Sequence, residues 1–220
     1  MCGDASLANV MRILVADDHP MFRLAVREIL ARHYRGVEIV EAAGAPEVIE
    51  QVAKQDWALL LLDINLPGRS GLDVLRDVKA IRPELPVLMV TSYAEEQFAL
   101  RAIKAGASGY LTKDAAAADL IKAVEKILTG GKFVTASVAD RLVNNLQTDS
   151  QDKPAHETLS DREFHVLRAL AGGKTAKEVA HDLSISIKTV STYRTRVLEK
   201  LALKTNADLT RYALQHRLIE

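Results

Sequence analysis

Five polar side chains in the first half of the chain each follow a short apolar run. Three are carboxylates, one is a hydroxyl and one is an ammonium: Asp17, Asp18, Asp63, Thr91 and Lys113. Three clustered carboxylates repel one another and therefore favour a hard divalent cation such as Mg²⁺, which takes oxygen ligands. One carboxylate can also attack phosphorus and form an aspartyl-phosphate. A divalent cation and a lysine would then neutralise the phosphoryl oxygens, as phosphoryl transfer requires.

Such chemistry needs a fold that brings the ends of several strands to one edge. The apolar runs lack polar alternation, which is typical of strands buried on both faces of a parallel sheet. They predict five strands, at 12–16, 37–40, 58–62, 86–90 and 108–111. The patterns between them predict helices over 20–33, 45–54, 71–82, 94–104 and 115–128. Five such units predict a doubly wound α/β domain, in which ligands bind beyond the carboxyl ends of the strands.

The five polar positions, with the stretches DINLPGRSGLDVL and GASGYLTKD, resemble the receiver domain of bacterial two-component response regulators over about residues 11–130. The resemblance implies a flavodoxin-like fold and a loop shaped by Pro67 and Gly68. It implies these roles at the phosphoryl group: Asp63 as phospho-acceptor, Lys113 as its cationic partner, and Thr91 with Tyr110 as the switch pair. It implies an Mg²⁺ site formed by Asp17, Asp18, Asp63 and the backbone carbonyl of Asn65.

Two other interpretations of this half stay open. A degenerate receiver would keep the fold without the chemistry, and an aspartyl-phosphate hydrolase would use the same nucleophile catalytically. Such hydrolases normally carry a second Asp two residues after the nucleophile, where this chain has Asn65. The sequence therefore favours a protein that is not an enzyme. No histidine is predicted to bind metal, and His19, beside Pro20, is interpreted as a helix-cap residue.

From Leu159 onward the pattern predicts four helices and no strands. Helix starts are predicted from capping residues: Ser160 with Glu163, Thr175 with Glu178 and Asn206 alone, besides Ser70 with Asp73 in the first half. A helix over about 187–201 has a core side formed by Val190, Tyr193, Val197 and Leu201. Its outward side is polar and has basic flanks, which suits a helix in the major groove of DNA.

The stretch of about 156–220 resembles the LuxR-type helix-turn-helix, with the motif proper at 176–195, and the whole chain resembles the NarL/FixJ class of response regulators. The resemblance implies base contacts from Ser191, Thr192 and Thr195, and phosphate contacts from Lys188, Arg194, Arg196 and Lys204. Ser191 and Tyr193 stand where this class often has a basic residue and a histidine, so the operator sequence is not predicted. A protein-interaction role for this half, without DNA, is the alternative.

Composition and charge divide the chain in the same way. Residues 1–150 hold 17 Lys and Arg against 20 Asp and Glu, whereas residues 151–220 hold 12 against 9. The predicted domains are an extension (1–10), a receiver (11–130), a linker (131–155) and a DNA-binding domain (156–220). The longest apolar run has six residues and the only cysteine is Cys2, which argues against a membrane span and an intrachain disulfide. We therefore expect a cytoplasmic transcription regulator. Its expected partners are promoter DNA with a two-fold site and a sensor histidine kinase. A second copy of the chain is expected to bind after phosphorylation, and RNA polymerase is a candidate partner.

Overall fold

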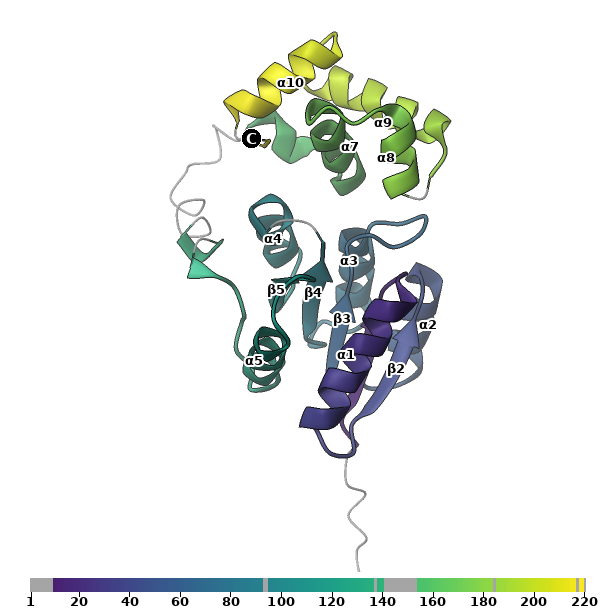
Figure 1. Ribbon diagram of the computed structural model, residues 1–220, viewed down its shortest axis with the longest axis vertical. Coiled ribbons are helices and arrows are strands. Elements are labelled where there is room, and N and C mark those ends of the chain that lie inside the picture. Colours follow the sequence, from purple (N-terminus) through teal and green to yellow (C-terminus); the bar gives the residue numbers. More distant parts are fainter. Residues whose placement is uncertain are drawn as a thin grey trace, which may run out of the picture.

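The computed structural model describes residues 10–219 except 93–94, 137, 141–153, 184 and 217. An α/β part and a helical part follow one another along the chain (Figure 1). Within the predicted linker at 131–155, residues 137 and 141–153 lie outside the described residues. Among the described residues, no helix is long and apolar enough to cross a membrane.

The first part is built on a five-stranded parallel sheet in the order β2-β1-β3-β4-β5. All five strands lie within two residues of the apolar runs that predict them: β1 (Arg12–Ala16), β2 (Glu38–Ala42), β3 (Leu59–Leu62), β4 (Val87–Thr91) and β5 (Gly109–Thr112). The sheet confirms the predicted doubly wound, flavodoxin-like fold. Leu60 and Leu88, in the central strands, are fully buried.

Helices cover both faces of the sheet and separate two apolar cores. They are α1 (Pro20–His33), α2 (Ala45–Lys54), α3 (Gly71–Ile81), α4 (Glu95–Lys104) and α5 (Ala117–Leu128). Side chains of α1 and α5, such as Leu30 and Val124, share one core with one face of the sheet. Those of α2, α3 and α4 share the other core with the opposite face. Both faces of the sheet are therefore buried from solvent. Ligands can reach the sheet at the carboxyl ends of its strands.

The second part contains the four predicted helices and one 3₁₀ turn. These elements are η1 (Ala155–Thr158), α7 (Asp161–Ala171), α8 (Ala176–Asp182), α9 (Ile187–Lys200) and α10 (Asn206–Gln215). The Ser160–Glu163 and Thr175–Glu178 capping boxes are both confirmed. Val190 and Val197 of α9 are fully buried, and Leu201 is 7% exposed, as the predicted core side requires.

Of the two other predicted caps, Asn206 is wrong, and Ser70 is confirmed without its predicted box. Thr205, not Asn206, caps α10, because the Thr205 side chain accepts from the backbone N–H of Asp208 in a full capping box. Ser70 caps α3 by accepting from Leu72 alone. Asp73 does not complete a box there, since its carboxylate pairs with Arg76 one turn further on.

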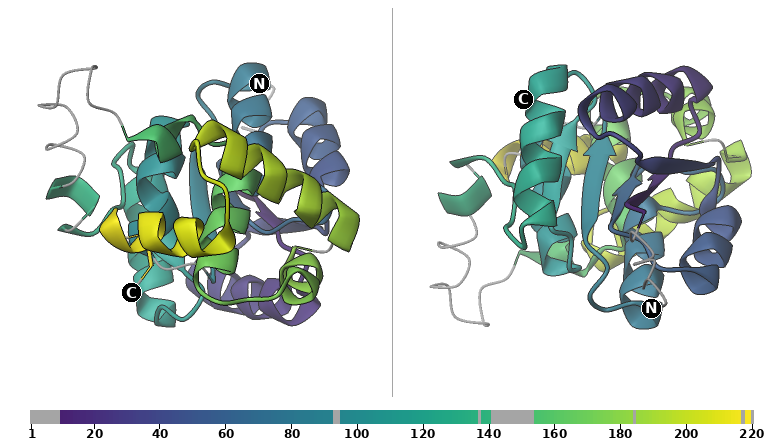
Figure 2. Two further views of the ribbon diagram at one scale, coloured as in Figure 1. Left: turned by 90° about the horizontal axis from the view of Figure 1, so that it is seen from above. Right: turned by 90° about the horizontal axis from the view of Figure 1, so that it is seen from below.

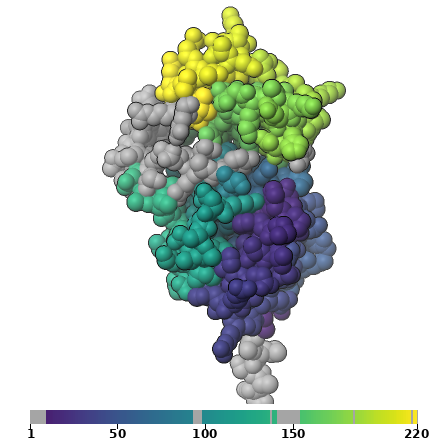
Figure 3. All heavy atoms as spheres, in the orientation of Figure 1, coloured from purple at the N-terminus to yellow at the C-terminus, as the bar shows by residue number. Residues whose placement is uncertain are grey.

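The helical part lies against the α/β part (Figure 3), with α7 above α3 and α4 in Figure 1. The apolar core on the α3 and α4 side of the sheet continues into α7, α9 and α10 through Phe164, Leu198 and Leu209. The ring of Phe98 on α4 meets that of Phe164 on α7 edge to face, with 5.6 Å between centroids. The two parts therefore share apolar contacts as well as the polar ones described below.

Candidate functional site

Strand register brings two carboxylates together at the edge of the sheet. Ala16 of β1 pairs with Leu62 of β3, so the next residues, Asp17 and Asp63, lie side by side. Both are almost completely buried, at 1% and 2% exposure. Oxygen atoms of Asp17, Asp18 and Asp63 lie within 4.8 Å of one another. The predicted acidic cluster is thus present in the folded chain.

Lys113, the residue directly after β5, forms ion pairs with two carboxylates of this cluster. Its Nζ lies 2.6 Å from Asp17 Oδ2 and 2.7 Å from Asp63 Oδ2. Burial lowers the pKa of Lys113, but the Asp63 and Asp17 carboxylates outweigh burial and hold it above its ordinary value of 10.5. The ring of Phe22 lies 4.8 Å from the ammonium, a cation–π contact that the sequence did not predict. The ammonium is therefore held between two carboxylates and an aromatic face.

Thr91 and Tyr110 lie on the neighbouring strands. Thr91 ends β4 and is fully buried, and its hydroxyl has no hydrogen-bond partner among the described residues. The backbone N–H of Lys113 donates to the Thr91 carbonyl at 2.8 Å, which places the hydroxyl-bearing residue beside the lysine. Tyr110 of β5 is 1% exposed, so its side chain is turned into the protein. A buried hydroxyl without a partner carries a desolvation cost that an incoming oxygen acceptor would relieve.

The loop between β3 and α3 depends on glycine at two points. Gly68 has a φ of +74°, a left-handed conformation that favours glycine and fits its predicted role in shaping this loop. A Cβ on Gly71 would lie 1.9 Å from the carbonyl oxygen of Asp63, which no other residue could tolerate. The backbone N–H of Asn65 donates to Asp63 Oδ1 at 3.1 Å. Gly71 therefore allows the start of α3 to approach the backbone of Asp63.

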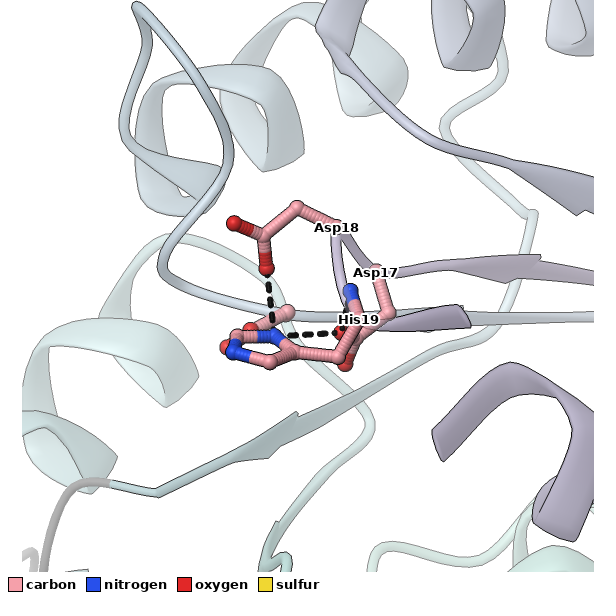
Figure 4. A group of neighbouring side chains, drawn as sticks. Asp17, Asp18 and His19 are labelled. Atoms are coloured by element: carbon pink, nitrogen blue, oxygen red, sulfur yellow. Dashed lines mark hydrogen bonds and ion pairs between the residues drawn. The ribbon is translucent and has the colours of Figure 1, made fainter. Parts of the chain in front are cut away.

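His19 occupies the N-cap position of α1, as the sequence predicts, but its side chain makes no capping hydrogen bond. Its Nδ1 lies 2.6 Å from Asp18 Oδ1 and 3.1 Å from Asp17 Oδ1, so the ring faces the two carboxylates (Figure 4). Arg23, which the sequence did not single out, donates to the backbone carbonyl of Asp17. Both contacts join residues between the end of β1 and the first turns of α1. The periodicity of the apolar runs predicts strands and does not predict such contacts.

Six of the seven predicted DNA-contacting residues lie on α9, and Lys204 follows between α9 and α10. Six of the seven are exposed: Lys188, Ser191, Thr192, Thr195, Arg196 and Lys204. The Ser191, Thr192 and Thr195 hydroxyls donate to backbone carbonyls one turn earlier in the chain. Arg194 is half-buried and donates to Asn206 Oδ1 at 2.6 Å. Arg194 therefore ties α9 to the start of α10.

These features define a class of protein: an α/β domain with a buried carboxylate cluster and a lysine at its strand ends, joined to a helix-turn-helix domain. The family described as "Response regulator receiver domain" matches residues 13–125, and the family described as "Bacterial regulatory proteins, luxR family" matches residues 157–213. The chain belongs to the two-component response regulators that combine a receiver with a LuxR-type DNA-binding domain.

Similar proteins extend over nearly the whole chain. The response regulator GacA of Pseudomonas protegens is 31% identical over 212 residues, which cover 96% of this chain and 99% of that protein. The oxygen regulatory protein NreC of Staphylococcus epidermidis is 34% identical, over 96% of this chain and 100% of NreC. A structure of the response regulator RcsB bound to DNA aligns with a TM-score of 0.56 at 28% identity, over 93% of this chain and 98% of RcsB. Similarity to RcsB along both domains supports a role in transcription regulation.

Proposed function

We propose that this response regulator is phosphorylated on Asp63 and that phosphorylation controls its binding to promoter DNA. The observation that carries the proposal is the meeting of Asp17, Asp63 and Lys113 at 2.6 and 2.7 Å on one buried edge. A carboxylate that attacks phosphorus becomes an aspartyl-phosphate, and its added negative charge needs a nearby cation. Lys113 is such a cation beside Asp63.

In the proposed reaction, a carboxylate oxygen of Asp63 attacks the phosphorus of a phosphohistidine on a sensor kinase. The phosphorus–nitrogen bond breaks, and its electron pair leaves with the imidazole, which takes up a proton. Lys113 then pairs with the new phosphoryl oxygens. The Thr91 hydroxyl, which has no partner within the described part of the chain, donates to one of them. Tyr110, which is buried on β5, would follow the movement of Thr91 as the second member of the switch pair.

The carboxylates fit an Mg²⁺ ion, since hard oxygen donors are those the ion prefers. Asp17, Asp18, Asp63 and the backbone carbonyl of Asn65 would hold it. When bound, Mg²⁺ would neutralise negative charge on the phosphoryl oxygens.

At the DNA, α9 would enter the major groove with its exposed hydroxyls towards the bases. Base contacts are assigned to Ser191, Thr192 and Thr195, and phosphate contacts to Lys188, Arg194, Arg196 and Lys204. The DNA-bound structure of the similar protein RcsB supports DNA binding by this domain. Helix-turn-helix modules act in pairs on two-fold sites, so we propose a homodimer after phosphorylation, acting in the cytoplasm with a sensor histidine kinase and, at promoters, RNA polymerase.

Footprinting on genomic DNA fragments tests the proposal. The protein is incubated with acetyl phosphate and Mg²⁺, and protected fragments are compared with those of the untreated protein and of Asp63→Asn. We expect protection to increase with acetyl phosphate in the wild type only. Equal protection in all three samples would contradict control by Asp63, and absence of protection in every sample would contradict DNA binding.

A further inference from the structure

Two histidine rings meet where the chain enters the helical part. His156 lies in η1, before α7, and His216 directly follows α10. Their ring centroids are 5.2 Å apart and their planes are inclined by 64°. The two residues are far apart in the chain, so no spacing in the sequence predicts the pair. The view from above shows α10, in yellow, on the outer side of the helical part (Figure 2), and His216 is exposed there.

The separation of the two rings fits a pair of imidazoles bound to one metal ion. A tetrahedral Zn²⁺ ion binds imidazole nitrogen at about 2.0–2.1 Å. Two imidazoles at that distance, on two corners of the tetrahedron, have ring centroids about 5 Å apart. His156 and His216 already have this separation. Both rings could therefore reach one ion without a change in the spacing of η1 and α10.

Tyr212 of α10 orients the ring of His156. Its hydroxyl lies 3.1 Å from His156 Nδ1 and accepts from the His156 backbone N–H at 3.2 Å. Burial raises the pKa of Tyr212 above its ordinary value of 10.0, so the hydroxyl stays protonated at neutral pH and forms hydrogen bonds instead of binding a metal ion. A histidine that binds metal usually has its other ring nitrogen bonded to an oxygen atom. With Nδ1 held by Tyr212, His156 Nε2 is the nitrogen that remains for a metal ion.

The charges around the pair keep His156 in the form that binds metal. Burial, followed by His216 and Arg101, lowers the pKa of His156 from 6.5 to about 4, so the ring is neutral at pH 7, and neutral imidazole is the metal ligand. The Arg101 guanidinium donates to the His156 carbonyl at 2.8 Å and would oppose a bound cation. Arg101 also pairs with the Asp161 carboxylate at 3.1 Å, which weakens this opposition, and the Glu157 carboxylate favours positive charge at His156.

We propose that His156 and His216 bind a divalent transition-metal ion such as Zn²⁺, at a site separate from the carboxylate cluster. Imidazole nitrogen suits Zn²⁺, Cu²⁺ and Ni²⁺, whereas Mg²⁺ prefers oxygen ligands. Two protein ligands leave the other positions of the ion to water, which reaches the exposed His216. The bound ion joins η1 to the end of α10. Since Arg101 of the receiver holds the His156 carbonyl, the ion fastens the last helix to the segment where the two parts of the protein meet.

NMR of the histidine rings in the full-length protein tests the site directly. The 6 histidines are labelled with ¹⁵N and assigned by replacing each in turn with Gln. Zn²⁺ is then added in steps at neutral pH. We expect the ring nitrogens of His156 and His216 to shift together with Zn²⁺, and Mg²⁺ to leave both unchanged. Zn²⁺ bound only at the carboxylate cluster would shift His19; a shift of His19 alone, or of one member of the pair alone, would overturn the proposal.

Variants distinguish one shared ion from separate binding at each ring. Loss of a group that orients a ligand typically lowers metal affinity about 10- to 100-fold, so Tyr212→Phe should weaken Zn²⁺ binding at His156 about tenfold, and His216→Gln should weaken it further. His181→Gln is the matched control, since His181 is 92% exposed and lies on α8, and it should leave the affinity within about twofold. Wild-type affinity in His216→Gln, with native circular dichroism, would refute the shared site, and wild-type affinity in Tyr212→Phe would refute the role of Tyr212.

Amide hydrogen exchange tests whether the ion fastens α10. Helix ends open at little cost in free energy and therefore exchange fast. An ion that joins His216 to η1 should slow exchange in the last turn of α10. We expect exchange there to become at least about threefold slower with Zn²⁺ in the wild type, and to stay unchanged in His216→Gln. Equal exchange with and without Zn²⁺ in wild-type protein whose two rings are bound would contradict the fastening of α10.

Discussion

Replacing Lys113 by Met should destabilise the receiver far more than replacing Asp63 by Asn. Lys113 is 12% exposed and lies 2.6 and 2.7 Å from two carboxylates that are 2% exposed. At an effective dielectric constant of about 20, each pair represents about 6 kcal/mol of Coulomb attraction. Removing the cation leaves two buried carboxylates uncompensated, which typically costs about 3–5 kcal/mol. We expect Lys113→Met to lower the free energy of unfolding by that amount.

Asp63→Asn should change the free energy of unfolding by less than about 1 kcal/mol, because opposing interactions of Asp63 nearly cancel. The carboxylate gains the attraction of Lys113. It is repelled by Asp17, whose oxygen lies within 4.8 Å, by at least about 3.5 kcal/mol at the same dielectric constant. Repulsion from Asp18, weakened by partial exposure of that side chain, adds to it.

Urea unfolding without divalent cations measures both variants. The only tryptophan, Trp57, is 8% exposed and lies in the α/β part, so its fluorescence reports on the receiver. Lys122→Met is the control, since Lys122 is 68% exposed and pairs with Asp119 on its own helix, and it should change little. A Lys113→Met variant as stable as the wild type, or an Asp63→Asn variant equally destabilised, would refute the electrostatic account of the site.

Three further predictions concern pH, salt and metal. Burial, with His216 and Arg101 nearby, lowers the pKa of His156 from 6.5 to about 4. Because the unfolded chain binds this proton first, stability should fall between pH 6.5 and 4, and urea midpoints should fall less in His156→Gln. The double variant Arg194→Ala with Arg196→Ala is titrated with DNA at several salt concentrations. The slope of log affinity against log salt should become less steep by about 0.9 for each phosphate that is no longer neutralised. An unchanged slope would exclude phosphate binding by both arginines. Mg²⁺ at about 100 times its dissociation constant should raise the free energy of unfolding of the wild type by about 2.7 kcal/mol, and the same concentration should have little effect on Asp17→Asn.

Strand-end residues were the predictable component of the site. An apolar run fixes where a buried strand ends to within two residues, and parallel strands end at one edge. The sequence alone therefore predicts that Asp17, Asp63 and Lys113 lie close together. Capping boxes were equally readable at Ser160 and Thr175, since both partners lie within four residues of the chain.

Contacts between distant residues could not be predicted in this way. The Phe22 ring over Lys113 and the bond from Asn65 to Asp182 join residues far apart in sequence, and no periodicity encodes such pairs. Competition between local partners was not predicted either. Asp73 pairs with Arg76 instead of completing a box with Ser70. His19 stands at the predicted cap position of α1, but its ring faces the neighbouring carboxylates.

The central claim is that Asp63 is the residue that accepts the phosphoryl group. Intact-mass spectrometry after incubation with acetyl phosphate and Mg²⁺ tests it most directly, with Asp63→Asn treated in parallel and peptide mapping to locate the modification. We expect the wild type to gain the mass of one phosphoryl group, located at Asp63, and the variant to gain none. A folded wild-type sample without the gain, or the same gain in Asp63→Asn, would contradict the claim.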